Sequence, residues 1–67
     1  MKIYRVDTYM NNPKREHHDL YGDYDDAMSY YNGVKNNPNC ESIEVMMLEN
    51  TDEFSLFEAT EIVASYS

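Results

Sequence analysis

The first ten residues alternate between hydrophobic and polar side chains. Within KIYRVDTYM, residues 2–10, every second position from Tyr4 to Met10 is apolar or β-branched, a period typical of a half-buried strand. The turn signal NNP follows at 11–13. Residues 14–21, KREHHDLY, are long enough to return as the second strand of a hairpin, but they alternate poorly. The pattern predicts a strand over 2–10 and leaves 14–21 open between strand and loop.

Helical spacing begins after Gly22, which ends the preceding segment. Asp23 is a good N-cap residue, with Asp26 three positions later. Asp25 and Asp26 then lie in the first turn, where the helix dipole favours negative charge. Pro38 prevents the helix from continuing. These signals predict a helix over 24–36, with one apolar face formed by Tyr24, Ala27, Met28, Tyr31 and Val34.

The last third of the chain predicts a second hairpin. Residues 41–49, ESIEVMMLE, give the clearest strand. NTD at 50–52 is a turn signal, and EFSLFE at 53–58 returns with its apolar residues facing the same way as those of the first strand. The final residues, 58–66, suit either a strand or a helix. Their β-branched content favours a strand, with a bulge around 57 and 58 to restore the apolar phase.

One face of the 41–49 strand is predicted to point away from the helix. It carries Glu44, Met46 and Leu48, and the predicted hairpin puts Phe57 near Glu44 on the same face. An apolar strip rimmed by acids is typical of a contact surface, although a single helix also leaves part of any sheet uncovered. For so short a chain, a symmetric dimer through this face or through a sheet edge would supply the missing burial.

Together the elements predict an α+β fold in one domain, 1–67, with a small antiparallel sheet and one helix packed on one face, ordered ββαββ or βαββ. A chain of 67 residues buries only about 60% of its unfolded surface. The single cysteine, Cys40, allows no intrachain disulfide and favours a reducing, cytoplasmic setting. No apolar run approaches about 18 residues, and the N-terminus lacks the apolar core of a signal peptide, so no membrane contact is expected.

Charge is divided unevenly along the chain. Residues 1–15 hold four bases against one acid, or +3, and residues 16–67 hold one base against twelve acids, or −11, giving the total of −8. Such a field repels nucleic acid and acidic membranes and attracts basic partners, so no direct binding of DNA or RNA is expected. The acids suit three readings: mimicry of phosphates in a basic groove, an acidic interaction surface of another purpose, or solubility.

Catalytic and metal-binding chemistry find little support in the sequence. His17 and His18 point to opposite faces if they lie on a strand, and no CxxC or HxxxH spacing accompanies them. The acidic neighbour Glu41 raises rather than lowers the pKa of the Cys40 thiol. The two glycines form no phosphate-binding loop. We therefore expect no enzyme, no cofactor and no metal.

The segments MKIYRVDTYM, DYDDAMSYYNGV and IEVMMLENTDEFSLFEA, with the acidic total, resemble small phage-encoded proteins that disable a host enzyme or a bacterial defence system. Anti-CRISPR proteins and DNA-mimicking inhibitors are among them. The resemblance is one of type and carries over no functional residue. It implies a non-enzymatic inhibitor that acts in the host cytoplasm on a basic nucleic-acid-handling or defence protein.

The residues expected to contact such a partner are acids, with apolar side chains as anchors. They are Asp19, Tyr21, Asp23, Tyr24, Asp25, Asp26, Glu44, Met46, Leu48, Glu49, Phe57, Glu58 and Glu61. The alternative is a small homodimeric structural or regulatory module without DNA mimicry, in which the acids only maintain solubility.

Overall fold

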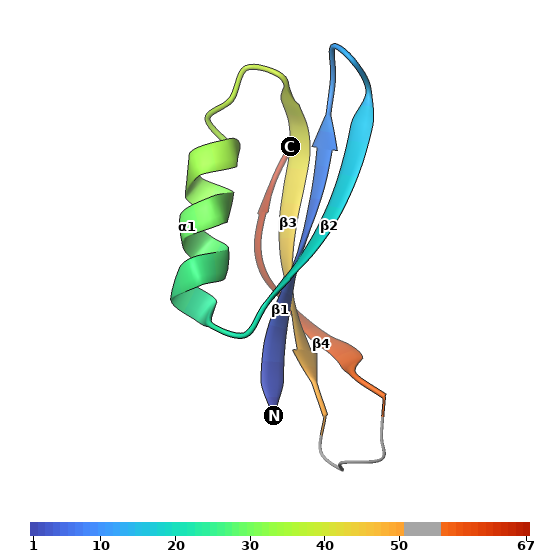
Figure 1. Cartoon of the computed structure of the whole chain (residues 1–67), viewed down its shortest axis with the longest axis vertical. Helices are drawn as coiled ribbons and strands as arrows, with labels where there is room; N and C mark the ends of the chain where they lie inside the picture. The colour runs from blue at the N-terminus through green and yellow to red at the C-terminus, as the bar shows by residue number, and fades with distance from the viewer. Residues whose placement is uncertain (51–55) are drawn as a thin grey trace.

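A computed structural model shows one helix and a four-stranded antiparallel sheet (Figure 1), and it describes residues 1–50 and 56–67. The sheet order is β2-β1-β3-β4. The predicted α+β fold is confirmed, and the version with a loop after the first turn is wrong. The elements are β1 (Lys2–Met10), β2 (Arg15–Tyr21), α1 (Tyr24–Val34), β3 (Cys40–Glu49) and β4 (Glu58–Tyr66).

β1 and β2 form a tight hairpin whose register runs from Tyr4 opposite Tyr21 to Met10 opposite Arg15. In the turn, Asn12 has a φ of 59°, in the left-handed region that asparagine tolerates better than most residues. β1 also pairs along its other edge with β3. It is therefore an interior strand with hydrogen-bonded neighbours on both sides.

Helix α1 begins where the aspartates predict. Asp23 is the N-cap, and its side chain accepts a hydrogen bond from the backbone N–H of Asp25 at 3.3 Å. At the other end the backbone N–H of Lys35 donates to the carbonyl of Tyr31 at 2.9 Å. The helix ends at Val34, two residues earlier than expected, and its eleven residues leave three turns to cover the sheet.

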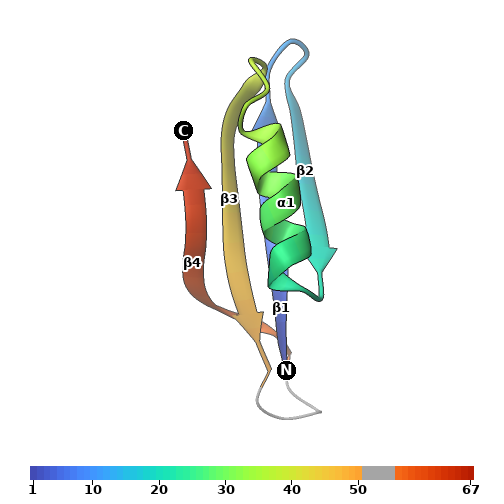
Figure 2. The same cartoon turned by 90° about the vertical axis from the view of Figure 1, so that its left-hand side faces the viewer.

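The helix lies against one side of the sheet, which we call the helix face; the other side is the open face. Figure 2 shows α1 in front of β1, with β4 at an edge that the helix leaves uncovered. Burying one Val or Ile side chain contributes about 1.5–3 kcal/mol. The buried core cluster between helix and sheet consists of Val6, Ala27, Tyr31, Ile43 and Val45.

β4 begins later than the sequence predicts. Its first residue, Glu58, lies opposite Glu49. Leu56 and Phe57 precede the strand, so the predicted strand over 53–58 is wrong at these two positions. Leu56 is 87% exposed, and no sheet neighbour covers it. The rest of that prediction, at 53–55, and the turn at 51–52 lie outside the described residues.

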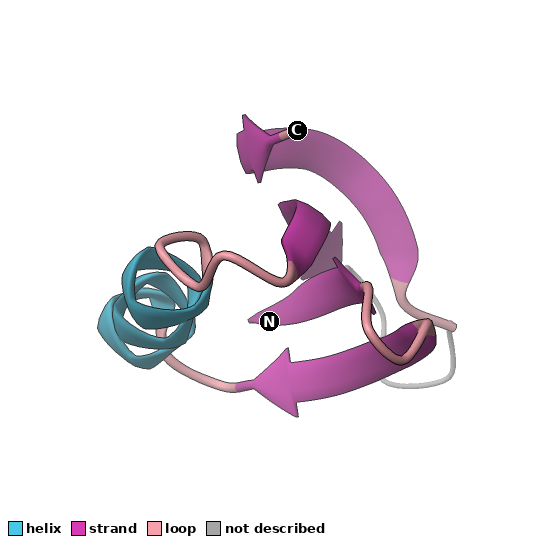
Figure 3. Ribbon diagram, turned by 90° about the horizontal axis from the view of Figure 1, so that it is seen from above, coloured by secondary structure: helices cyan, strands magenta, loops and turns pink. Residues whose placement is uncertain are grey.

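The strand interpretation of 58–66 is confirmed, but its bulges lie elsewhere than predicted. The register shifts opposite the steps Val45–Met46 and Met47–Leu48, which leaves Val63 and Thr60 as extra residues on β4. No shift falls at 57 or 58. Bulges increase the local twist of a strand, and β4 curves strongly around the end of the sheet in Figure 3. Within the described part of the chain, no helix is long and apolar enough to cross a membrane.

Candidate functional site

The end of β2 and the first turn of α1 bring several of the predicted contact residues together. Only Gly22 and Asp23 separate the two elements, so acids on both sides of the connection lie near one another. Tyrosines accompany them. The ring centroids of Tyr21 and Tyr30 are 5.9 Å apart. We call this surface the acid–tyrosine patch, formed by Asp19, Tyr21, Asp23, Tyr24, Asp25, Asp26 and Tyr30.

The pKa of the Tyr21 hydroxyl is raised by acids from both β2 and α1. Burial is the largest cause that raises the pKa of Tyr21, followed by the negative charge of Asp19 on β2. Interaction with Tyr30 and the charge of Asp26 on α1 add to the effect. Carboxylates from a strand and from a helix therefore act on one hydroxyl group.

Basic side chains of the described residues do not pair with the aspartates of this patch. Lys2 pairs with Glu49 at 3.6 Å, and the ammonium of Lys35 lies 5.1 Å from the ring centroid of Tyr31. Lys14 is in the turn between β1 and β2, and Arg15 begins β2. Figure 1 shows this turn at the opposite end of the sheet from the first turn of α1. Across residues 1–50 and 56–67, no ion pair joins a base to an aspartate of the patch. Its negative charge is therefore not neutralised within the described structure.

The predicted strand acids do not join the patch. Glu49 is engaged with Lys2, and Glu58 lies directly opposite Glu49 in the sheet. Glu61 is on β4, and Glu44 lies on the open face. The structure thus separates the predicted contact acids into two groups, one around the helix N-terminus and one along β3 and β4.

Two of the predicted apolar anchors differ from expectation. Leu48 was expected to be an exposed contact residue, but it is only 8% exposed. Leu48 is buried because Ile3 on β1 and Ala59 on β4 lie directly beside it in the sheet. Met46 lies on the same face and is half-buried. Leu48 is therefore a packing residue of the open face rather than a contact residue.

Phe57 does not lie beside Glu44. The β4 residue opposite Glu44 is Ser65, and Phe57 precedes the pair formed by Glu49 and Glu58 at the other end of β3. The prediction assumed that pairing resumed directly after the turn. The longer connection shifts every β4 residue along the sheet, and Phe57 is left 37% exposed beside the strand.

A charged network on the open face was missed by the sequence analysis, which treated His18 as an ordinary surface residue. The Arg5 Nε donates to Oδ2 of Asp7 at 3.0 Å. The His18 Nδ1 lies 2.6 Å from Oδ1 of Asp7, and its Nε2 lies 2.8 Å from Oε1 of Glu16. We call these four residues the His18 network. β1 supplies Arg5 and Asp7, the adjacent β2 supplies Glu16 and His18, and Asp7 is directly opposite His18.

Both ring nitrogens of His18 face carboxylate oxygens, which accept hydrogen bonds but cannot donate them when ionised. When His18 is protonated, both nitrogens donate and the ring carries a positive charge between the two acids. The hydrogen bond to Asp7, and then that to Glu16, raises the pKa of His18 accordingly. Neither nitrogen is left to accept a proton as a general base. The network is a structural cation between two acids rather than a catalytic pair.

The contact between Asp7 and His18 could have been predicted from the register of the β1–β2 hairpin. A turn over 11–14 places Met10 opposite Arg15, and each step away from the turn then fixes one further pair. Counting back three pairs puts Asp7 opposite His18. The prediction was not made because residues 14–21 were left open between strand and loop.

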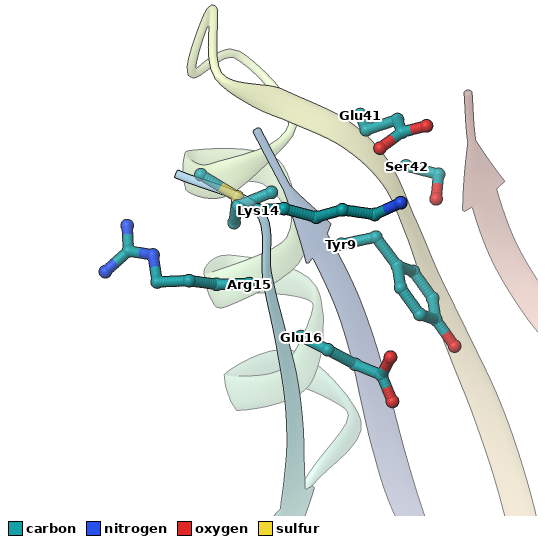
Figure 4. A pocket seen from close by; sticks show the side chains of 7 residues that line it. Tyr9, Lys14, Arg15, Glu16, Glu41 and Ser42 are labelled. Atoms are coloured by element: carbon teal, nitrogen blue, oxygen red, sulfur yellow. The ribbon is translucent and has the colours of Figure 1, made fainter. Parts of the chain in front are cut away.

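A cavity of about 550 Å³ lies between the hairpin end and the start of β3. Its lining includes the ammonium of Lys14 and the carboxylates of Glu16 and Glu41, so its charges are mixed. Figure 4 shows Arg15 pointing away from the other labelled side chains. The cavity does not include the acid–tyrosine patch. Its lining residues are Tyr9, Met10, Lys14, Arg15, Glu16, Glu41 and Ser42.

In the part of the chain that the structure describes, no group of three or more His, Cys, Asp or Glu side chains is arranged to hold a metal ion. Cys40 is half-buried, and this burial raises the pKa of its thiol. The pKa of Cys40 is raised, as the sequence predicts, but the cause is loss of water rather than the charge of Glu41. A thiol with a raised pKa is a poor nucleophile at neutral pH.

Comparisons of the chain with protein-family models, with curated proteins and with solved structures find no match. The surface chemistry of the described residues is therefore the basis for assigning a function.

Proposed function

We propose that the protein is a non-enzymatic inhibitor, from a phage or mobile element, that binds a basic nucleic-acid-handling or defence protein in the host bacterial cytoplasm. The acid–tyrosine patch is the binding surface. The observation that supports this proposal is the concentration of four aspartates on one end of the molecule without a basic side chain to neutralise them. Uncompensated charge on one surface steers an oppositely charged partner towards it.

The tyrosines make the patch suited to arginine in particular. Carboxylates form paired hydrogen bonds with a guanidinium group, and aromatic rings stack on its flat face. Tyr24 is exposed and held edge-on by Tyr4, with ring centroids 5.7 Å apart. Basic grooves that bind nucleic acid present many arginines. The patch would occupy such a groove as a partial mimic of the phosphate backbone.

The test is affinity capture from a bacterial lysate with and without nuclease, followed by binding measurements on the recovered partner. The double variant Asp25→Lys with Asp26→Lys changes the net charge by +4 within the patch and leaves the N-cap Asp23 in place. Glu58→Lys with Glu61→Lys makes the same change on β4. We expect the first variant to bind at least tenfold more weakly and the second to bind nearly as the wild type.

Salt provides an independent measurement, because surface ion pairs are screened as ionic strength rises. Binding through the patch should weaken strongly between low and high salt. Equal losses in both double variants would indicate a general charge effect, and unchanged binding in the patch variant would exclude the patch as the binding surface.

A second candidate function is a small homodimeric structural or regulatory module, in which the acids serve solubility. The observation that favours it is the exposure of large apolar side chains on the open face, where Leu20 is 63% exposed and Ile62 is 56% exposed. In that case the acid variants would leave the function unchanged, and substitutions at these two residues would abolish it.

A further inference from the structure

The open face carries an ordered apolar strip. The strand register places Leu20, Arg5, Met46 and Ile62 in one row across β2, β1, β3 and β4. The next row, towards the N-terminus of β1, contains the half-buried Ile3 beside two further apolar residues. Helix α1 packs on the opposite face. Leu20, Met46 and Ile62 form an apolar strip that Arg5 interrupts, and no element of the described chain lies over it. An exposed apolar strip of this kind is typical of an interaction surface.

The neighbouring row on the open face, which contains His18, Asp7 and Glu44, is polar. Its charges are largely compensated together with those of Arg5 and Glu16 in the adjoining rows. Asp7 is offset by Arg5 and by the protonated His18, and Glu16 is also bound to His18. Only Glu44, opposite Asp7 on β3, has no base beside it. With His18 protonated, these two positive and three negative groups sum to a net charge of −1, whereas the whole chain carries −8 with both histidines neutral.

We propose that the open face is a self-association surface and that a second copy of this chain covers it. Two copies with a charge of −8 repel each other over most of their surface. The open face is the part where this repulsion is weakest, because its network offsets most of its acids. A strongly basic partner would gain little from a surface whose charges are already paired. An apolar strip beside charges of both signs matches a second copy of the same strip.

The size of the face is sufficient for such a contact. Four strands about 4.8 Å apart and about eight residues long at about 3.4 Å per residue cover roughly 500 Å². Two copies would bury roughly 1,000 Å² in total, which is at the lower limit for a specific interface. We therefore expect a dimer with a dissociation constant in the micromolar range. This proposal does not depend on the acid–tyrosine patch, which lies beside the helix.

The experiment is sedimentation equilibrium of the full chain from about 1 to 500 μM. Leu20→Asp on β2 and Ile62→Asp on β4 place a charge at the two ends of the apolar row. Each should raise the dissociation constant of the dimer at least tenfold, because the carboxylate would lose water against an apolar surface. Leu56→Asp is the matched control, since Leu56 is an exposed apolar residue outside the sheet. It should leave the dimer intact.

The two variants also distinguish a face contact from an edge contact. Leu20 and Ile62 lie on opposite edge strands, so pairing through one edge would respond to only one of them. That result would overturn the proposal, as would a wild-type chain that stays monomeric at 500 μM or variants that dimerise like the wild type. Circular dichroism would check that each variant keeps its fold, and Leu20→Ser and Ile62→Ser provide milder replacements.

Discussion

The Nδ1 of His18 lies 2.6 Å from Oδ1 of Asp7, and Asp7 is only 6% exposed although it lies on the open face. The contact joins the edge strand β2 to the interior strand β1 through side chains as well as through the backbone. The raised pKa of His18 couples this side-chain contact to the protonation of one imidazole ring.

The first prediction concerns pH. The hydrogen bonds to Asp7 and Glu16 raise the pKa of His18 in the folded chain above the ordinary value of 6.5. The stabilisation is therefore complete below about pH 6.5 and is lost as the pH rises through the raised value. We expect the free energy of unfolding, measured with urea at intervals from pH 5.5 to 9, to fall over that window. His18→Gln should lose this part of the pH dependence, and His17→Gln should keep it. Parallel curves for the wild type and His18→Gln would contradict the assignment.

The second prediction concerns the centre of the same network. Asp7→Ala removes the acceptor of both Arg5 and His18, so we expect a loss of about 1–3 kcal/mol in the free energy of unfolding. Glu16→Ala removes a partner that is well exposed, and its cost should be below about 0.5 kcal/mol. Urea denaturation below pH 6.5 would compare the two. Equal losses of unfolding free energy in the two variants would show that the burial of Asp7 does not strengthen its contacts.

The third prediction separates the two faces of the sheet. Ile43 is fully buried in the core cluster, and Ile43→Ala should cost about 2–5 kcal/mol of unfolding free energy. Ile62→Ala removes the same atoms from the open face and should change stability by about 0.5 kcal/mol or less. The comparison should be made at low micromolar concentration, where self-association contributes least. A large effect at Ile62 under those conditions would mean that the open face is covered within one chain.

The fourth prediction concerns the start of α1. Asp23 accepts the backbone hydrogen bond of Asp25, so Asp23→Ala should cost about 0.5–2 kcal/mol. Ser29→Ala, on the exposed side of the same helix, should be neutral or slightly stabilising because alanine has the highest helix propensity. Thermal unfolding followed by circular dichroism would measure both. If Asp23→Ala were neutral, the cap would not contribute to helix stability.

Most of the fold was predictable because local rules determine it. The alternation in β1 and β3 and the cap at Asp23 each depend on residues close together in the chain. The α1 boundary was wrong by two residues at its C-terminus, where no glycine or proline stands directly after Val34 to fix the end. These are the features for which periodicity and capping chemistry are sufficient.

The placement of β4 was not predictable in the same way. Its start depends on how long the connection after Glu49 is, and its register depends on the bulges at Thr60 and Val63. Both are properties of pairing with β3 rather than of the β4 sequence. Phe57 was misplaced for this reason. Leu48 lies on the predicted face, but Ile3 and Ala59 beside it leave it buried. The proximity of the acids and tyrosines in the acid–tyrosine patch, by contrast, was predictable from the sequence. The connection between β2 and α1 is only two residues long, so the ends of the two elements must lie close together.

The interior position of β1 has a consequence for how the chain assembles and opens. Its hairpin with β2 can form as soon as residues up to Tyr21 are available, but its other edge must wait for β3, where Lys2 meets Glu49 across most of the chain. Such distant pairing slows folding. β4 lies at an edge of the sheet, and none of its residues is fully buried. It can therefore leave and return while the other three strands hold, and its amide protons should exchange with solvent well before those of β1.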